Sequence, residues 1–189
     1  MTPDVQARLG ALYREIEAAR HELVSLIKEH TAGPVDDMAL AGPSGPVPLS
    51  ALFGERDELL LVFNMGAHCA YCTLWADEAN GVLRHLRQAA AFAVTSPDPP
   101  EVQAAFAASR GWAFPMVSHA GTDFAASQGF AAETEDGPGW MPGVASYRRT
   151  PEGIVRVATM YFGPGDPYCS VFHYLELLGS EGAGYAPTL

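Results

Sequence analysis

The stretch ELLLVFNMGAHCAYCTLWAD, residues 58–77, joins a continuous apolar run to a Cys-x-x-Cys motif and then to a helical pattern. An unbroken apolar run of this length is typical of a strand buried on both faces of a sheet. Beyond it, Cys72, Trp75 and Ala79 recur at helical spacing. We therefore predict a central strand, a turn that carries Cys69, and a helix whose buried side carries Cys72.

The rest of the chain continues this alternation of strands and helices. The expected elements after the motif are a buried strand over 91–95, a helix over 101–109, a short strand over 115–118, a short helix over 123–128, two antiparallel strands over 143–149 and 154–162, and a last helix over 168–178. We expect a turn-rich loop over 134–139. Alternation followed by a hairpin predicts an α/β fold, in which a central mixed β-sheet is flanked by helices.

Three further segments complete the expected organisation. Residues 1–32 hold a long amphipathic helix, in which Leu9, Leu12 and Ile16 begin an apolar stripe. We favour a helix laid over its own domain, but the spacing also fits a coiled-coil arm that would form a homodimer. Residues 33–179 form one domain, whose prolines confine a hairpin over 38–49 to a sheet edge. Residues 180–189 are expected to be a flexible tail.

Composition narrows the classes of protein. Of the 189 residues, 48% are hydrophobic, which is enough for a sizeable core, and the net charge is −11. Such acidity argues against nucleic acid or an anionic membrane surface as a partner. The sequence has no apolar segment of membrane-spanning length and no apolar signal core near its start. The chain has three cysteines, which is not the pattern of a disulfide-stapled secreted domain, so we expect a cytoplasmic protein.

The two cysteines of the motif suit thiol–disulfide chemistry. The first turn of a helix has free backbone N–H groups and the positive end of the dipole, and both favour a thiolate at Cys69. A protonated His68 would add a positive neighbour. Cys72, one turn later, is expected to be more buried. We therefore predict that Cys69 attacks and Cys72 resolves, without a cofactor.

A proline precedes the strand expected over 143–149. Thioredoxin-like folds hold a cis-proline facing their cysteines at this position, and a cis bond at Pro142 would leave the backbone of Met141 free to pair with an extended substrate. The alternative is an ordinary trans proline at the end of a loop. The sequence does not decide between the two.

Several segments resemble a known family. The order of a strand, a Cys-x-x-Cys motif and a helix, with a proline before a later strand, resembles that of the thioredoxin superfamily. The chain is more closely similar to the bacterial thioredoxin-like family called domain of unknown function 899, and the similar segments are CAYCTLWAD at 69–77, GWAFP at 111–115, the stretch 118–130 and HYLEL at 173–177. The resemblance implies a thioredoxin-like fold and a redox-active dithiol. We expect His68, Tyr71, Trp75, Met141 and Pro142 to border the substrate site.

The sequence also departs from better-known relatives. Thioredoxin has a buried acid six residues before its first cysteine, whereas this chain has Phe63. Peroxiredoxins place Thr three residues and Pro seven residues before the attacking cysteine, whereas this chain has Gly66 and Val62. These differences argue against thioredoxin's proton route and against direct peroxide chemistry of the peroxiredoxin type.

Two other functions stay open. Cys69, Cys72, Cys169 and His173 would supply the four ligands of a zinc site, if the two halves of the set converged. A thioredoxin-like binding module with an inactive dithiol is the third possibility. For the redox function, we expect a protein or a low-molecular-weight disulfide or thiol as partner. Asp77 and Glu78 are expected on a solvated helix face.

Overall fold

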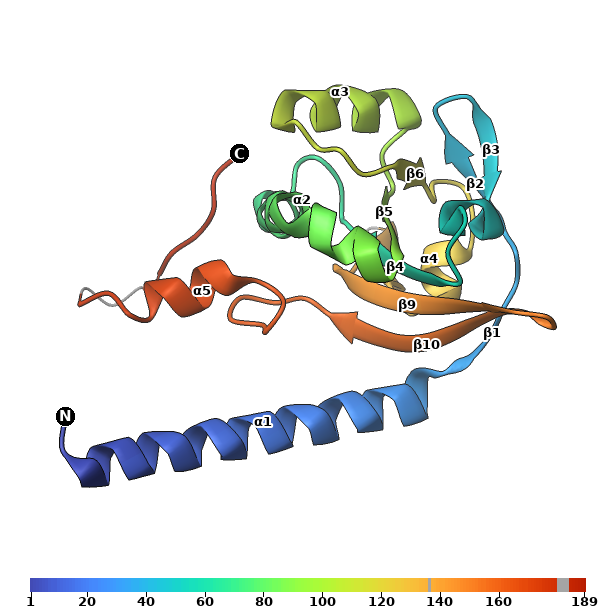
Figure 1. Ribbon diagram of the computed structural model, residues 1–189. Coiled ribbons are helices and arrows are strands. Elements are labelled where there is room, and N and C mark those ends of the chain that lie inside the picture. The colour runs from blue at the N-terminus through green and yellow to red at the C-terminus, as the bar shows by residue number, and fades with distance from the viewer. Residues whose placement is uncertain (136, 180–183) are drawn as a thin grey trace.

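The structure is a computed structural model that describes residues 1–135, 137–179 and 184–189 (Figure 1). Its helices are α1 (Pro3–Thr31), the 3-10 helix η1 (Leu49–Phe53), α2 (Ala70–Ala89), α3 (Pro100–Arg110), α4 (Phe124–Ser127) and α5 (Ser170–Leu175). Its strands are β1 (Gly33–Val35), β2 (Ala39–Gly42), β3 (Gly45–Pro48), β4 (Glu58–Phe63), β5 (Ala91–Ser96), β6 (Met116–Ser118), β7 (Ala131–Thr134), β8 (Gly137–Trp140), β9 (Gly143–Thr150) and β10 (Gly153–Tyr161).

Eight of the strands form one mixed sheet in the order β1-β10-β9-β4-β5-β6-β2-β3. Strand β4 is central, parallel to β5 and antiparallel to β9. Strands β9 and β10 are joined by a tight turn and are antiparallel, as their short link predicts. The predicted α/β fold with a mixed sheet is confirmed.

Helices cover both faces of this sheet because side chains along β4 and β5 alternate between them. On one face, Val62 and Val94 pack under α2 and α3. On the other face, Leu61 and Phe63 pack with η1 and α4. Both clusters are buried, which explains why the run over 58–63 is apolar without interruption.

The sheet ends on short strands that contain proline. At one edge, the β2–β3 hairpin carries Pro46 and Pro48 on its outer strand, as the prolines predict. At the other edge, the three residues of β1, with Pro34 in the middle, pair with β10. This second edge strand was not expected from the sequence.

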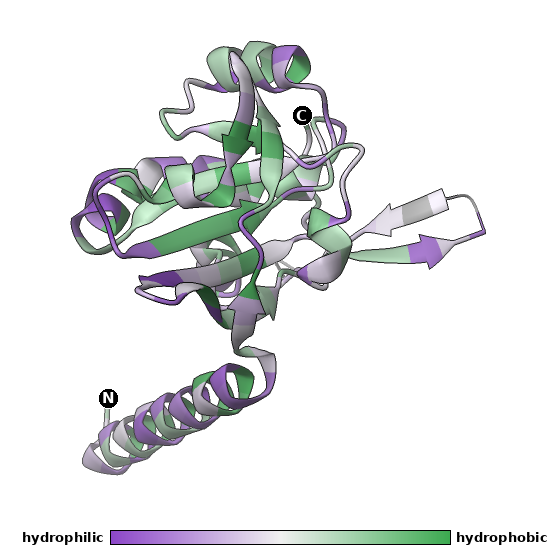
Figure 2. Cartoon of the chain, turned by 90° about the vertical axis from the view of Figure 1, so that its right-hand side faces the viewer, coloured by the Kyte–Doolittle hydropathy of each residue, from purple (hydrophilic) through white to green (hydrophobic). Residues whose placement is uncertain are grey.

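One expected loop contains a hairpin instead. Residues 131–134 and 137–140 pair as β7 and β8, with Thr134 opposite Gly137. Figure 2 shows this hairpin projecting from the rest of the chain. The polar residues and the Gly-Pro-Gly sequence of 134–139 correctly indicated a turn, but they gave no sign of the short strands on either side of it. Of the predicted flexible tail, residues 180–183 lie outside the described part of the chain.

Helix α1 meets the domain through its last turns. The Arg156 Nε donates to the Thr31 carbonyl at 2.7 Å, and the Thr31 Oγ1 accepts from the Thr159 N–H at 3.0 Å. No residue of α1 is buried. Figure 1 shows the helix running past the sheet beside β10 rather than across it.

None of the described helices is both long enough and apolar enough to cross a membrane.

Candidate active site

The turn between β4 and α2 is built around Gly66 and Asp98. Gly66 has a φ of +120°, in the region that favours glycine, and an added Cβ would lie 3.1 Å from an Asp98 carboxylate oxygen. The Ala67 N–H donates to the Asp98 Oδ2 at 2.7 Å, and the Cys69 N–H donates to the Gly66 carbonyl at 3.1 Å. This turn therefore delivers Cys69 to the start of α2 in a fixed position.

Cys69 is the N-cap of α2. Its backbone is extended, with φ −89° and ψ 103°, and its Sγ accepts the Cys72 N–H at 3.0 Å. A sulfur thus takes the place of the oxygen that usually caps a helix. Cys69 is only 8% exposed, so a reactant can approach its sulfur from a restricted direction.

The surroundings of Cys69 favour its thiolate. The Cys72 side chain donates a hydrogen bond to the Cys69 sulfur, and this bond is the main reason that the pKa of Cys69 falls to about 6. Burial acts in the opposite direction. The backbone N–H of Cys72 and the charge of the exposed His68 lower the pKa further. Cys69 is therefore a thiolate near neutral pH.

Cys72 has the opposite character. It is fully buried, and its Sγ accepts the Met65 N–H at 3.3 Å. Its pKa is raised far above the ordinary range, first because its proton is held in the hydrogen bond to Cys69 and second because of burial. The two cysteines thus form an unequal pair, a thiolate beside a protonated thiol.

The third cysteine lies in the same apolar cluster. Cys169 is the N-cap of α5 and is fully buried. The cluster contains Cys69, Cys72, Trp75 and Cys169, with Met65, Tyr71, Leu74, Phe162, Val171 and Phe172 packed against it. Burial and a hydrogen bond to Glu78 raise the pKa of Cys169 to about 12. Cys169 is therefore a neutral thiol at physiological pH.

The zinc ligand set does not come together. The three cysteines share a cluster, but the side chain of His173 is 49% exposed and lies 4.0 Å from Glu176. Across the described residues, no group of three or more His, Cys, Asp and Glu side chains could hold a metal ion. The zinc alternative rested on the spacing of Cys169 and His173 in the sequence. In the structure, that spacing does not place the His173 imidazole near the cysteines.

Two aromatic side chains lie beside the cysteines, Tyr71 within the motif and Trp75 three residues after it. The rings of Tyr71 and Trp75 lie 6.1 Å apart, and Trp75 contacts Phe162 at 5.2 Å. The Trp75 Nε1 donates to the Asp166 Oδ2 at 2.9 Å, and Asp166 also accepts the Gly163 N–H at 3.1 Å. Asp166 therefore holds the segment after β10 against α2.

The structure has a trans bond at Pro142, since no peptide bond among the described residues is cis. The backbone of Met141 is not free either, because its N–H donates to the Phe130 carbonyl at 2.9 Å. Met141 and Pro142 are not members of the cysteine cluster, and Pro142 is linked to it by Phe162, whose N–H donates to the Pro142 carbonyl. The pairing of a substrate with Met141, expected for a cis-proline, has no free donor here.

Phe63 lies six residues before the first cysteine, where thioredoxin has its acid. Its ring stacks on Phe130 at 3.9 Å and on Phe124 at 5.8 Å, in the cluster on the opposite face from α2. A carboxylate at this position would have no place in that packing. Proton transfer from Cys72 therefore needs a route other than thioredoxin's.

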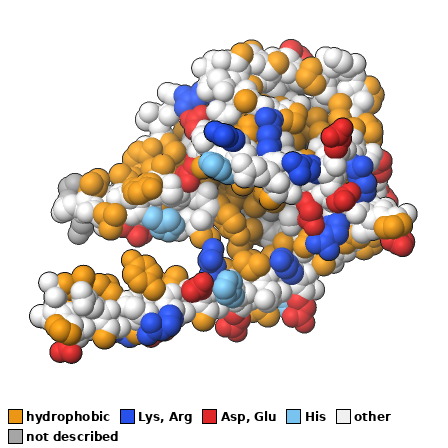
Figure 3. All heavy atoms as spheres, in the orientation of Figure 1, with side chains coloured by type: hydrophobic (Ala, Val, Ile, Leu, Met, Phe, Trp, Pro, Cys, Tyr) orange, Lys and Arg blue, Asp and Glu red, His pale blue; other side chains and the backbone are white. Residues whose placement is uncertain are grey.

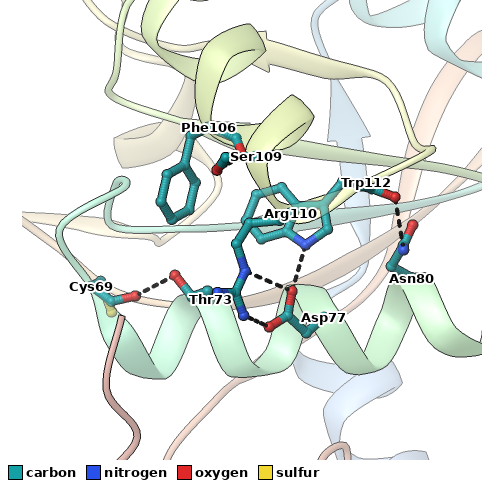
Figure 4. A network of polar contacts seen from close by, with 9 residues as sticks. Cys69, Thr73, Asp77, Asn80, Phe106, Ser109, Arg110 and Trp112 are labelled. Carbon is teal, nitrogen blue, oxygen red and sulfur yellow. Dashed lines mark hydrogen bonds and ion pairs between the residues drawn. The ribbon is translucent and has the colours of Figure 1, made fainter.

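Asp77 and Glu78 are not on a free solvated face. Asp77 forms an ion pair with Arg110 and accepts the Trp112 Nε1 at 2.7 Å (Figure 4). The Glu78 carboxylate accepts the Ser170 N–H at 2.8 and 3.0 Å. These carboxylates join α2 to α3 and to α5. Helical spacing alone shows which side a residue lies on, but not which distant element covers it.

Asp98 and Asp166 were missed by the sequence analysis. Asp98 had a detectable signal, because it follows β5, and parallel neighbours such as β4 and β5 end at the same edge of a sheet. An acid after β5 is therefore placed beside the turn after β4. Asp166 lies in an irregular segment and had no comparable signal.

Comparison with known proteins identifies the family and the fold. The model of the family described as bacterial protein of unknown function (DUF899) matches residues 5–182. No curated protein matches the chain in sequence.

Among solved structures, the chain is similar to peroxidoxin BcpB from Mycobacterium tuberculosis, with a TM-score of 0.52 and 22% identity over 69% of this chain and 81% of that one. Peroxiredoxin Q from Xanthomonas campestris matches with a TM-score of 0.55 and 21% identity, over 74% of this chain and 90% of that one. A PrxQ mutant from Xylella fastidiosa matches with a TM-score of 0.62 and 17% identity, over 78% of this chain and 95% of that one. The chain has the thioredoxin-like fold of these proteins.

Proposed function

Because this chain belongs to the family described as bacterial protein of unknown function (DUF899), we propose its activity from its own site. The proposed activity is that of a thiol–disulfide oxidoreductase, in which Cys69 attacks and Cys72 resolves. The observation that carries the proposal is the unequal pair of thiols at the start of α2, with the pKa of Cys69 lowered to about 6 and that of Cys72 raised.

The reaction conserves atoms and electrons in two exchanges. The Cys69 thiolate attacks one sulfur of a substrate disulfide, which forms a mixed disulfide and releases the other sulfur as a thiolate that takes a proton from water. Cys72 then gives its proton to water and attacks the Cys69 sulfur, which forms the Cys69–Cys72 disulfide and releases the second substrate sulfur as a thiolate that takes up a proton. Two electrons pass to the substrate, and an external thiol reductant restores the dithiol.

The two steps fit the two environments. Near pH 7 most of Cys69 is thiolate, and the thiolate is the attacking species. When Cys69 becomes part of a mixed disulfide, it no longer carries the negative charge that opposes ionisation of Cys72. The barrier to the second exchange therefore falls at the moment when it is needed. His68, Tyr71 and Trp75 are the proposed substrate-contacting residues because they adjoin the motif.

We place this activity in the cytoplasm, where thiols are kept reduced. The three free cysteines support this placement. The proposed partners are protein or low-molecular-weight disulfides and thiols.

A thiol count tests the proposal. The reduced protein is treated with a small excess of oxidised glutathione, and the remaining thiols are counted after denaturation, alongside metal analysis. We expect two of three thiols to disappear in the wild type, and both of the remaining two in Cys169→Ser. Cys69→Ser should lose no thiol pair, and Cys72→Ser should trap glutathione on Cys69, as seen by mass spectrometry. An unchanged thiol count in the wild type would favour the non-catalytic binding module.

Peroxide reduction is a second candidate, favoured by the low exposure of Cys69. The sulfur of a residue that is only 8% exposed is reached more easily by a peroxide than by a folded protein. The thiolate would take one peroxide oxygen to give Cys69 sulfenic acid and an alcohol, and Cys72 would then form the disulfide with release of water. Peroxidoxin BcpB and peroxiredoxin Q are among the solved structures of similar fold, which agrees with this chemistry, whereas Gly66 and Val62 argue against a peroxiredoxin-type site.

The two candidates are separated by their oxidants. Reduced protein is mixed anaerobically with either hydrogen peroxide or oxidised glutathione at equal concentration, and disulfide formation is followed by Trp fluorescence. Faster oxidation by the disulfide supports exchange, whereas oxidation at least tenfold faster by peroxide assigns the site to peroxide reduction.

A further inference from the structure

The exposed large hydrophobic side chains of this protein are concentrated at the two ends of the chain. Those in α1 are Val5, Leu9, Leu12, Tyr13, Ile16, Leu23 and Leu26, and those from the end of β10 onward are Tyr161, Tyr168, Tyr174, Leu177, Leu178, Tyr185 and Leu189. Apart from Met1, the only others among the described residues are Val82 and Val102. Large contiguous apolar surface on a soluble protein marks an interaction site.

On α1 these side chains form one continuous apolar seam. The seam consists of Val5, Leu9, Leu12, Ile16, Ala19, Leu23 and Leu26, with alternating steps of four and three residues throughout. This is the heptad pattern of a coiled coil, with Leu9, Ile16 and Leu23 at one of its two core positions. A helix of 29 residues is about 43 Å long, so the seam is long enough for a stable pair.

The seam is not the side of α1 that contacts the domain. Val24 and Ile27 line a groove of about 190 Å³ with Leu60, Val144 and Met160 of the sheet. On the helix, Val24 lies about 110° and Ile27 about 50° around from the middle of the seam, and both are half-buried whereas the seam residues are exposed. The domain therefore holds the last turns of α1 and leaves the seam uncovered, and Figure 3 shows an open gap between the first half of α1 and the α5 segment.

The charges beside the seam fit a second copy of the same chain. Glu15 and Arg20 flank the seam on opposite sides and are five residues apart. At this spacing, Glu15 of one helix faces Arg20 of the other across a parallel, in-register pair, twice by symmetry. We propose that the protein is a homodimer held by a parallel coiled coil of two α1 helices. This inference does not depend on the proposed redox function.

The test measures mass in solution. Sedimentation velocity of the wild type should give twice 20.1 kDa, and Ile16→Glu should give the monomer because a charge replaces the centre of the seam. The matched control, Ala7→Glu, adds the same charge on the opposite side of the helix and should remain dimeric. A monomeric wild type would overturn the proposal, as would an Ile16→Glu variant that stays dimeric. Circular dichroism checks that the domain of each variant is folded.

Charge exchange tests the register. Glu15→Lys and Arg20→Glu each place like charges across the proposed pair and should raise the dimer dissociation constant roughly tenfold. The double variant restores opposite charges and should regain most of the wild-type affinity. If the double variant were weaker than both single variants, the parallel register would be wrong.

Discussion

At the scale of single residues, the hydrogen bond between the two motif cysteines couples their acidities. The proton that Cys72 shares with the Cys69 sulfur is the largest cause of the low pKa of Cys69 and of the high pKa of Cys72. The backbone N–H groups of Cys72 and Tyr71 and the charge of His68 also lower the pKa of Cys69, but less. Cys69 therefore depends on Cys72 for its reactivity, and not only for the second step of the reaction.

This dependence predicts a pH profile. Alkylation of Cys69 by iodoacetamide requires the thiolate, so in the wild type its rate should fall as the pH falls through about 6. Cys72→Ala removes the hydrogen bond and should move the midpoint upward, toward the value of about 8.5 for a free thiol. Mass spectrometry of the Cys69 peptide measures the rate at each pH.

His68→Gln is the comparison for this profile. This change removes a smaller contribution to the low pKa of Cys69, so it should move the midpoint of the alkylation profile less than Cys72→Ala does. Equal midpoints for the wild type and Cys72→Ala would contradict the assigned cause of the low pKa.

At the scale of elements, α2 is the part to which the others attach. Its first turn carries the cysteines, Asp77 joins it to α3, and Glu78 joins it to the start of α5. The bond from Glu78 matters for the site because Cys169, at the start of α5, closes one side of the cysteine cluster. Access to the cluster on this side therefore depends on one carboxylate.

Loss of that carboxylate should expose Cys169. Glu78→Ala removes both hydrogen bonds to the Ser170 N–H, and it removes a group that raises the pKa of Cys169. We expect alkylation of Cys169 to become roughly tenfold faster, since hydrogen bonds to charged groups contribute 1.5 kcal/mol or more. Glu101→Ala, an exposed change on α3, is the control and should leave the rate unchanged. No acceleration in Glu78→Ala would mean that packing alone holds α5.

At the scale of the whole molecule, the sequence predicts elements better than it predicts contacts between them. The apolar runs predict β4 and β5, and the short link between β9 and β10 predicts their antiparallel pairing, because these signals are local. The strand β1 and the hairpin β7–β8 were missed, since strands of three or four residues carry little pattern, and β1 and β8 also consist largely of Gly and Pro. The motif cysteines were found from their spacing, whereas Asp98 and Asp166 act across 31 and 91 residues of sequence.

Stability of the whole domain should depend on a buried histidine. His119 is 1% exposed, its Nδ1 lies 3.1 Å from the Thr95 Oγ1, and its Nε2 has no hydrogen-bond partner among the described residues. Burial lowers its pKa to about 4. Between pH 6.5 and about 4 the unfolded chain binds a proton that the folded chain does not, so stability falls as the pH falls.

We expect protonation of His119 to lower the free energy of unfolding by about 2–3 kcal/mol as the pH falls from 6.5 to about 4. The measurement is the free energy of unfolding in urea at several pH values. His119→Gln lacks the titrating group, so its stability should fall less steeply than that of the wild type over the same range. Identical pH dependence in the two proteins would contradict this assignment.

The proline-containing edges of the eight-stranded sheet limit how the molecule can recruit other chains. Strand addition needs a long row of free backbone N–H and C=O groups, and short edge strands with proline do not offer one. An extended peptide therefore cannot easily lengthen this sheet from either side, and neither can a second copy, which also protects the protein from fibril-like growth. Contacts with other molecules are left to side chains, those around Cys69 and those along α1.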